Sequence, residues 1–206
     1  MPNREVMPNP ESSWEEYFEA AADKPVHPLY KVLEPFLPKT GTALEVGCGV
    51  GQGALFLAEK GLQVLAVDAK KEPLEVLQSK GNPRVETKMA FIEDLDFYRP
   101  FDVVVAGFSL FFVDPSEFES TWNRIVSWVR RGGLLMAQFL GPNDSWASGG
   151  YCVQTQDEIR RLIAPFEILH YDHVEREGST VQGHAKHWDV THFIGRRSVD
   201  PLAVTE

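Results

Sequence analysis

The sequence predicts an α/β fold organised around a βαβ unit. Two apolar runs, Thr42–Val46 and Leu62–Asp68, read as buried strands, and a turn with glycine at positions 47, 49, 51 and 53 follows the first. Glycine lets a ligand approach the backbone with no Cβ in the way. Asp68 follows Gly47 by 21 positions, about the spacing at which an acidic side chain reaches the two hydroxyls of a ribose. These features indicate a nucleoside-binding unit.

The remaining chain continues this alternation and then departs from it. Helices are expected at 14–22, 28–36, from 54, at 72–80, 114–129 and 155–164, and further strands at 84–90, 101–107, 134–140, 166–173 and 184–196. The last three elements are a strand, then a helix, then a hairpin whose connection spans 175–183. This ending is not a purely alternating pattern.

The domain organisation follows from composition along the chain. Residues 1–13 are polar and proline-rich, which predicts a flexible tail, and 14–200 are expected to form a single domain. Ser13 and Glu16 form a capping box for the first helix, within an N-terminal helical cap at 14–40. Residues 141–154 are rich in Gly, Asn, Asp, Ser and Trp, which predicts a loop over the site.

Charge and hydropathy exclude several classes of partner. The chain has 206 residues and a formal net charge of -10, with no Lys/Arg run longer than two residues, so binding to nucleic acid is not expected. It has no apolar run long enough for a membrane span, and its polar start lacks a signal-peptide pattern. The expected partner is a small molecule. Both a monomer and a homodimer remain open.

The two cysteines, Cys48 and Cys152, are expected to be free thiols. A disulfide at Cys48 would block the ligand turn in which it lies. Free thiols are typical of a reducing compartment, so we expect a cytoplasmic protein.

The identity of the nucleoside depends on the first strand. Glu45 lies two residues before Gly47, where its carboxylate can meet a cationic amino-acid group rather than a pyrophosphate. The segment from Glu45 to Gly51, Glu-Val-Gly-Cys-Gly-Val-Gly, resembles motif I of the class I S-adenosylmethionine-dependent methyltransferases. This resemblance implies a Rossmann-like, doubly wound, seven-stranded sheet that is mostly parallel, with the last strand antiparallel.

A second resemblance lies outside the βαβ unit. The start of the chain and the segments 143–146 (Asn-Asp-Ser-Trp) and 186–188 (Lys-His-Trp) look like TehB-type and related small-molecule methyltransferases. It implies methyl transfer to a small nucleophile such as a thiol or tellurite. The cofactor would be S-adenosylmethionine, released as S-adenosylhomocysteine.

The motif I resemblance also implies roles for residues. Glu45 would lie near the donor's ammonium group, and Asp68 would accept hydrogen bonds from both ribose hydroxyls. Where the family commonly places an Asp for the adenine amino group, this chain has Phe91, so Glu93 or the backbone of Ile92 is expected to substitute. The other residues expected to contact the donor are Gly47, Cys48, Gly49, Gly51, Ala69 and Phe108.

The acceptor site is predicted less directly. Its candidate residues are Trp14, Tyr17, Ser109, Trp146 and His187. No catalytic residue is identified, because methyl transfer from a sulfonium needs a general base only when the nucleophile carries a proton. Five of the six histidines lie between positions 170 and 192, yet no set of three or four converging ligands is evident, and no metal is expected.

Two other functions remain open. A noncatalytic module could keep the donor site and lack transfer activity. A nicotinamide-dependent oxidoreductase would also use a βαβ unit, but no tyrosine here is followed by a lysine four residues later, and a second substrate domain does not fit this length.

Overall fold

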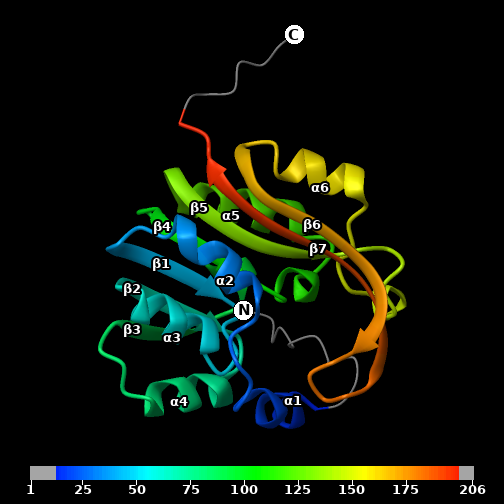
Figure 1. Ribbon diagram of the computed structural model, residues 1–206, viewed down its shortest axis with the longest axis horizontal. Coiled ribbons are helices and arrows are strands. Elements are labelled where there is room, and N and C mark those ends of the chain that lie inside the picture. The colour runs from blue at the N-terminus through cyan, green and yellow to red at the C-terminus, as the bar shows by residue number, and fades with distance from the viewer. Residues whose placement is uncertain (1–12, 200–206) are drawn as a thin grey trace.

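The computed structural model describes residues 13–199; the predicted tail at 1–12 and residues 200–206 lie outside the described residues. Seven strands form one sheet in the order β3-β2-β1-β4-β5-β7-β6 (Figure 1). β7 is antiparallel to both of its neighbours, β5 and β6, and the other four strand pairs are parallel. The predicted fold class is confirmed. The strands are β1 Gly41–Val46, β2 Leu62–Asp68, β3 Val85–Met89, β4 Phe101–Ala106, β5 Val129–Leu140, β6 Phe166–Ser179 and β7 Ala185–Arg197.

Six α-helices lie in the described residues: α1 Trp14–Ala21, α2 Leu29–Leu33, α3 Gln52–Glu59, α4 Lys71–Ser79, α5 Phe118–Trp128 and α6 Gln156–Leu162. Short 3-10 turns occur at Glu34–Phe36, Ile92–Asp94, Leu110–Phe112 and Ala147–Gly149. The capping box of Ser13 and Glu16 is confirmed, and Thr155 and Glu158 form a second one. None of the helices between residues 13 and 199 is both long and apolar enough to cross a membrane.

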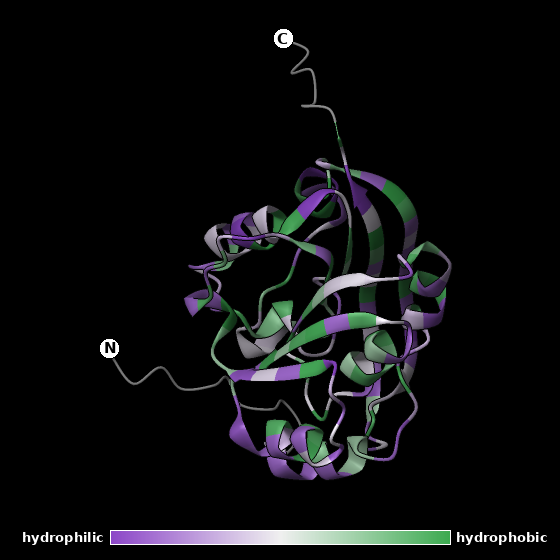
Figure 2. Cartoon of the chain, turned by 90° about the vertical axis from the view of Figure 1, so that its left-hand side faces the viewer, coloured by the Kyte–Doolittle hydropathy of each residue, from purple (hydrophilic) through white to green (hydrophobic). Residues whose placement is uncertain are grey.

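The core has one apolar layer on each face of the sheet. Ala43 of β1 packs with α2, α3 and α4 on one face, and its neighbour Leu44 packs with α5 and α6 on the other. Strands that are buried on both faces carry nearly continuous apolar runs, which is why β1 and β4 lack alternation. The helices are banded hydrophilic and hydrophobic (Figure 2), as expected when each buries one side.

The predicted helix at 114–129 differs from the structure at both ends. The Asp114 carboxylate accepts hydrogen bonds from the backbone N–H and the hydroxyl of Ser116, and its carbonyl accepts one from the N–H of Glu117. The expected helix start therefore forms a turn of its own, and α5 begins at Phe118. Val129 belongs to β5, where it pairs with Phe101.

The final hairpin is longer than predicted. The expected connection at 175–183 is mostly strand, because pairing continues from Glu175 with Asp189 to Ser179 with Ala185. The part of the hairpin at 175–189, called the β6–β7 arm, extends beyond β5, whose pairing with β7 ends at residue 190. The arm therefore does not pack on the sheet core, and its polar sequence lacks the alternation that marks a half-buried strand. At its tip, Val181 packs against an apolar cluster that includes side chains of α1. The arm lies beside α1 in Figure 1.

Candidate functional site

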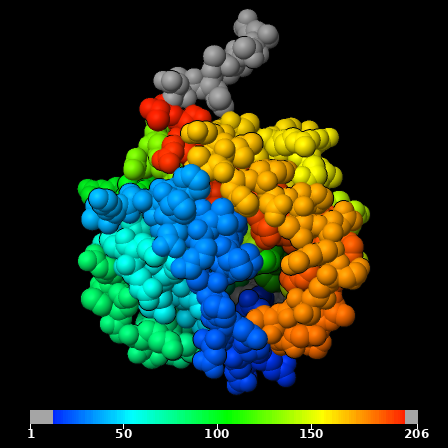
Figure 3. Space-filling view, viewed as in Figure 1, coloured from blue at the N-terminus to red at the C-terminus, as the bar shows by residue number. Residues whose placement is uncertain are grey.

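A cavity of about 920 Å³ opens at the carboxyl ends of β1, β2 and β4. Ligands bind at this edge in open α/β sheets, and the volume lies at the upper end of the usual range for small-molecule sites. The segment that contains α1 and the β6–β7 arm supply the remaining walls. Figure 3 shows the molecule hollowed between the blue N-terminal segment and the orange arm.

Glu45, near the end of β1, is buried at the cavity wall. The hydroxyl of Tyr30 donates a hydrogen bond to Oε1, whereas Oε2 is buried with no partner among the described residues. Burial raises the pKa of Glu45 to about 7. Gly53 has no room for a side chain, since a Cβ there would overlap both Tyr30 and Glu45. An unpartnered buried acceptor of this kind suits a cationic N–H group of a ligand.

Asp68, at the end of β2, also lines the cavity. Its Oδ2 accepts the backbone N–H of Gly49 at 2.8 Å, and its Oδ1 accepts that of Lys70 at 3.0 Å. Burial raises the pKa of Asp68 although these hydrogen bonds oppose the shift. Each oxygen keeps lone-pair capacity for a further donor, as a pair of neighbouring hydroxyls would require. Burial raises the pKa of Tyr17 in α1, and the negative charge of nearby Asp68 raises it further.

Residues of the glycine turn have two different roles: some line the cavity, and Gly51 shapes the start of α3. Gly47, Cys48 and Gly49 line the cavity, and a Cβ at Gly47 would overlap the Ser109 side chain. Gly51 does not line the cavity. It caps α3 in the left-handed region at φ 85, with a Cβ position that the side chain of Leu77 occupies.

The residues expected near the adenine come together in the structure. Ala69, Phe91, Ile92 and Glu93 all line the cavity. Oε1 of Glu93 accepts the backbone N–H of Asp114 at 3.2 Å, which ties this carboxylate to the loop before α5.

Phe108 and Ser109 follow β4 and line the centre of the cavity. Phe108 has φ 48, the single positive φ among the described non-glycine residues. Such strain persists only where surrounding contacts hold it, and here the Phe108 ring packs edge-on against His27, Phe111 and Trp188. The buried Oγ of Ser109 has no hydrogen-bond partner among the described residues.

The predicted aromatic walls are present. Trp14 lines the cavity and packs edge-on against Phe112, with ring centroids 5.0 Å apart. Trp146 lies in the 141–154 loop, and its ring faces Nζ of Lys186 at 3.8 Å. Lys186 forms a buried ion pair with Asp144. This pair joins the loop to β7 and holds Trp146 at the cavity wall.

His187 does not reach the cavity. Side chains alternate between the two faces of a strand, and Trp188, Val190 and His192 are the β7 residues that line it. His187 lies on the other face, with Nδ1 2.7 Å from a carboxylate oxygen of Glu177. The hydrogen bond to Glu177 raises the pKa of His187. We therefore leave His187 out of the acceptor site.

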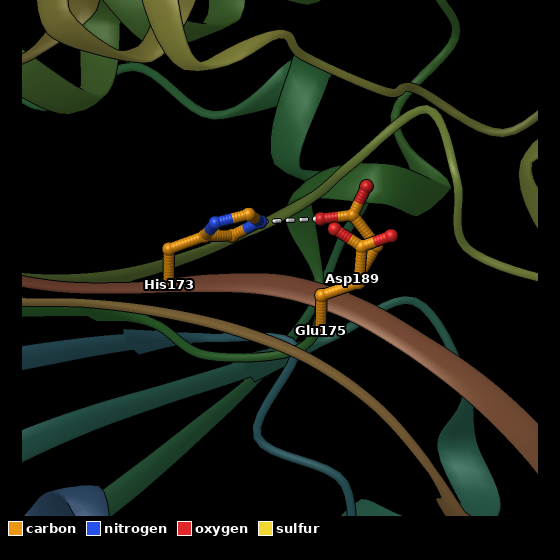
Figure 4. Close-up of side chains that lie close together, drawn as sticks. All are labelled: His173, Glu175 and Asp189. Carbon is orange, nitrogen blue, oxygen red and sulfur yellow. Dashed lines mark hydrogen bonds and ion pairs between the residues drawn. The ribbon is translucent and has the colours of Figure 1, made fainter.

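One group of side chains has a composition that could hold a metal. The potential ligand atoms of His173, Glu175 and Asp189 lie within 4.8 Å of one another. Figure 4 shows Nε2 of His173 directed at the Asp189 carboxylate, and the two atoms are 2.7 Å apart. Asn143 donates its backbone N–H to Asp189 and its side-chain amide to Glu175. None of the three lines the cavity, and these hydrogen bonds account for their proximity as a link between the loop and the arm.

The structure also adds polar residues that the sequence did not single out. These cavity-lining residues are Tyr30, His27, Gln138, Arg176 and His192. Gln138 is a lone buried polar residue in an apolar strand, which is a recognisable signal. Its partner is evident only from the register in which it pairs with His192 across β5 and β7.

Comparison with known proteins finds similarity to methyltransferases over part of the chain. A family model described as a methyltransferase domain matches residues 43–133. The cypemycin N-terminal methyltransferase of a Streptomyces species is 33% identical over 112 residues, which cover 53% of this chain and 46% of that protein. The match thus spans about half the length of that curated relative.

Solved structures agree at the level of fold. TehB from Haemophilus influenzae superposes with a TM-score of 0.73 at 17% identity, covering 90% of this chain and 68% of that one. The 1,6-didemethyltoxoflavin-N1-methyltransferase of Burkholderia thailandensis gives a TM-score of 0.67 at 18% identity, covering 92% of each chain. Residues 43–133 therefore match a methyltransferase-domain model, and the chain as a whole shares the fold of these solved structures.

Proposed function

We propose that this chain transfers a methyl group from S-adenosylmethionine to a small-molecule acceptor. The observation that carries the proposal is the pair of cavity-lining carboxylates, buried Glu45 and half-buried Asp68, at the ends of adjacent strands on either side of the glycine turn. One carboxylate suits an ammonium group and the other suits a ribose diol. S-adenosylmethionine carries both groups.

The residues present fit this donor. Oε2 of Glu45 is a buried acceptor that has no partner among the described residues, and the donor's ammonium group would supply one. The backbone at Gly47 and Gly49 leaves space beside the methionine part, and Asp68 would hold the ribose. Ala69, Phe91 and Ile92 would flank the adenine.

Methyl transfer requires the protein mainly to position the donor and the acceptor. When bound, S-adenosylmethionine supplies an electrophilic methyl carbon, whose bonding pair leaves on sulfur as a lone pair of the acceptor attacks. The chain's own contribution is to bind both molecules in one enclosed cavity and exclude water. The aromatic side chains of Trp14, Phe108, Phe112 and Trp146 provide that enclosure.

A small acceptor is supported by the walls of the cavity, since side chains of α1 and of the β6–β7 arm both line it and pack against one apolar cluster. The net charge of -10 also disfavours a polyanion. The names of two similar proteins give the N-terminus of cypemycin and N1 of 1,6-didemethyltoxoflavin as the methylated positions. Thiols and tellurite also stay within the proposal. Cytoplasmic location, oligomeric state and the absence of nucleic-acid binding remain predictions.

Calorimetric titration with S-adenosylmethionine and S-adenosylhomocysteine tests donor binding. Asp68→Asn removes the charge that the ribose hydroxyls would meet, and we expect it to weaken binding by about tenfold or more, since hydrogen bonds to charged groups are the stronger class. Asp96→Asn is the matched control, because Asp96 is exposed and does not line the cavity.

Folded protein that binds neither molecule would contradict the proposal, and the nicotinamide cofactors would then be titrated. If both molecules bind but no methylated product forms with any acceptor in a panel, the noncatalytic binding module is the better description.

A further inference from the structure

Two histidines with no assigned role lie together in the cavity lining. His27 precedes α2 and His192 belongs to β7, and their ring centroids are 5.7 Å apart. Both rings line the cavity. Burial lowers the pKa of His27 to about 4, with a further contribution from His192. Burial also lowers the pKa of His192, although Asp172 opposes the shift. Both imidazoles are therefore neutral at physiological pH.

Hydrogen bonds fix which nitrogen of each neutral ring carries the proton. The backbone N–H of Leu29 donates to Nδ1 of His27 at 3.2 Å. Because an amide N–H can only donate, Nδ1 is unprotonated and the proton lies on Nε2. The side-chain amide nitrogen of Gln138 lies 2.9 Å from Nδ1 of His192 and donates to it in the same way. Both rings thus carry an Nε2–H group, and no hydrogen bond joins either group to another described residue.

Charged side chains of both signs line the cavity. Glu45 and Asp68 are its carboxylates at the ends of β1 and β2. Arg176 also lines the cavity and is close enough to His192 to contribute to the lowering of its pKa. Arg176 forms no ion pair with another described residue. Asp172 pairs with His192 across the strands but lies outside the cavity lining.

We propose that the Nε2–H groups of His27 and His192 form a donor pair that binds a carboxylate of the methyl acceptor, with Arg176 adding a positive charge beside it. Carboxylate oxygens accept hydrogen bonds only, which matches two N–H groups on neighbouring rings. Glu45 and Asp68 would repel a carboxylate, which favours its binding at the histidines. The acceptor class is a small carboxylate-bearing molecule, held with its nucleophilic atom toward the donor.

These tautomers also exclude a general-base role for Nε2 of either histidine. A ring whose Nε2 already carries a proton cannot remove one from an acceptor at that atom. His27 and His192 are accordingly specificity-determining residues rather than general bases. This inference rests on the proposed function, because it names the substrate class of the same site.

The test measures binding to protein saturated with S-adenosylhomocysteine, so that it does not depend on turnover. Benzoate and benzamide serve as probes, because they share an aromatic ring and differ in the carboxylate. We expect benzoate to bind more tightly than benzamide. His27→Phe and His192→Phe keep a ring but lose the donor, so each should weaken benzoate binding by about tenfold and leave benzamide nearly unchanged.

Two sets of variants separate the donor from the fold. His27→Gln and His192→Gln retain a side-chain N–H and should restore part of the benzoate affinity. His184→Phe is the matched control, because His184 is exposed and lies outside the cavity lining. Long-range proton–nitrogen NMR of the two rings should show Nε2 protonated and Nδ1 unprotonated.

The outcomes distinguish this inference from the proposed function. If S-adenosylhomocysteine binds but benzoate does not, or if benzoate binds no better than benzamide, the carboxylate subsite is overturned. A proton on Nδ1 of either ring would also overturn it. If S-adenosylhomocysteine itself does not bind, the proposed function fails first, and the substrate class inferred from it falls with it.

Discussion

Replacing Glu45 by glutamine should stabilise the fold while weakening donor binding. The substitution keeps an acceptor for the Tyr30 hydroxyl and removes a buried negative charge. Burial raises the pKa of Glu45 from 4.5 to about 7, and this difference corresponds to about 3 kcal/mol between the folded and unfolded chains. Glutamine would replace the unpartnered Oε2 of Glu45 by an unpartnered amide nitrogen. The free-energy cost of burying a polar atom with no hydrogen bond is therefore nearly the same in both proteins.

The pH dependence of this effect has a definite sign. Between pH 4.5 and about 7 the folded protein binds more protons at Glu45 than the unfolded chain does, so its stability falls as pH rises. The stability gain from Glu45→Gln should therefore be absent below pH 4.5, grow up to pH 7 and stay constant above it.

Urea unfolding of ligand-free protein at a series of pH values measures this profile. Glu86→Gln is the matched control, because Glu86 is an exposed carboxylate on β3. A Glu45→Gln protein that is less stable than the wild type at pH 8 would refute the reasoning. So would a stability gain of equal size at pH 4 and pH 8, since it could not arise from the ionisation of Glu45.

Three further outcomes test neighbouring contacts. Tyr30→Phe removes a hydrogen bond that lowers the pKa of Glu45. As the solution is acidified, binding of S-adenosylhomocysteine should therefore begin to weaken at a higher pH than in the wild type. Tyr98→Phe, at a fully exposed site, should leave this pH unchanged. Gly53→Ala puts a methyl group into occupied space and should lower the free energy of unfolding by about 1–3 kcal/mol in urea melts. Lys186→Met leaves the Asp144 carboxylate buried without its cation, which should cost about 3–5 kcal/mol. Adding Asp144→Asn should recover part of that loss, and the coupling in this double-mutant cycle should vanish if the ion pair is unimportant.

The proposed donor half of the site could be predicted from the sequence because its parts lie within a short stretch of chain. A strand, a tight turn and a helix constrain one another locally, so Glu45, the glycines and Asp68 have nearly the same relative positions wherever such a unit occurs. Even here Gly51 proved to have a packing role against Leu77, because the unit alone does not reveal which neighbour fills that space.

The proposed acceptor half of the site could not be predicted from the sequence in the same way. His27 and His192 are separated by most of the chain, and they meet only because β7 enters the sheet beside β5 and the segment before α2 crosses the cavity. His187 has an equally suggestive sequence context, yet strand alternation turns it to the opposite face. A shift of one residue in register would exchange these two faces, and composition does not specify that register in a polar arm.

The sequence by itself determined the fold class, the order of most elements and the βαβ unit with its carboxylates, because local propensities and short-range spacing encode them. Tertiary structure alone decided the ends of α5, the length of the β6–β7 arm and which distant residues line the cavity. These features depend on contacts between residues far apart in the chain, and the free energy of those contacts is not expressed in any local pattern.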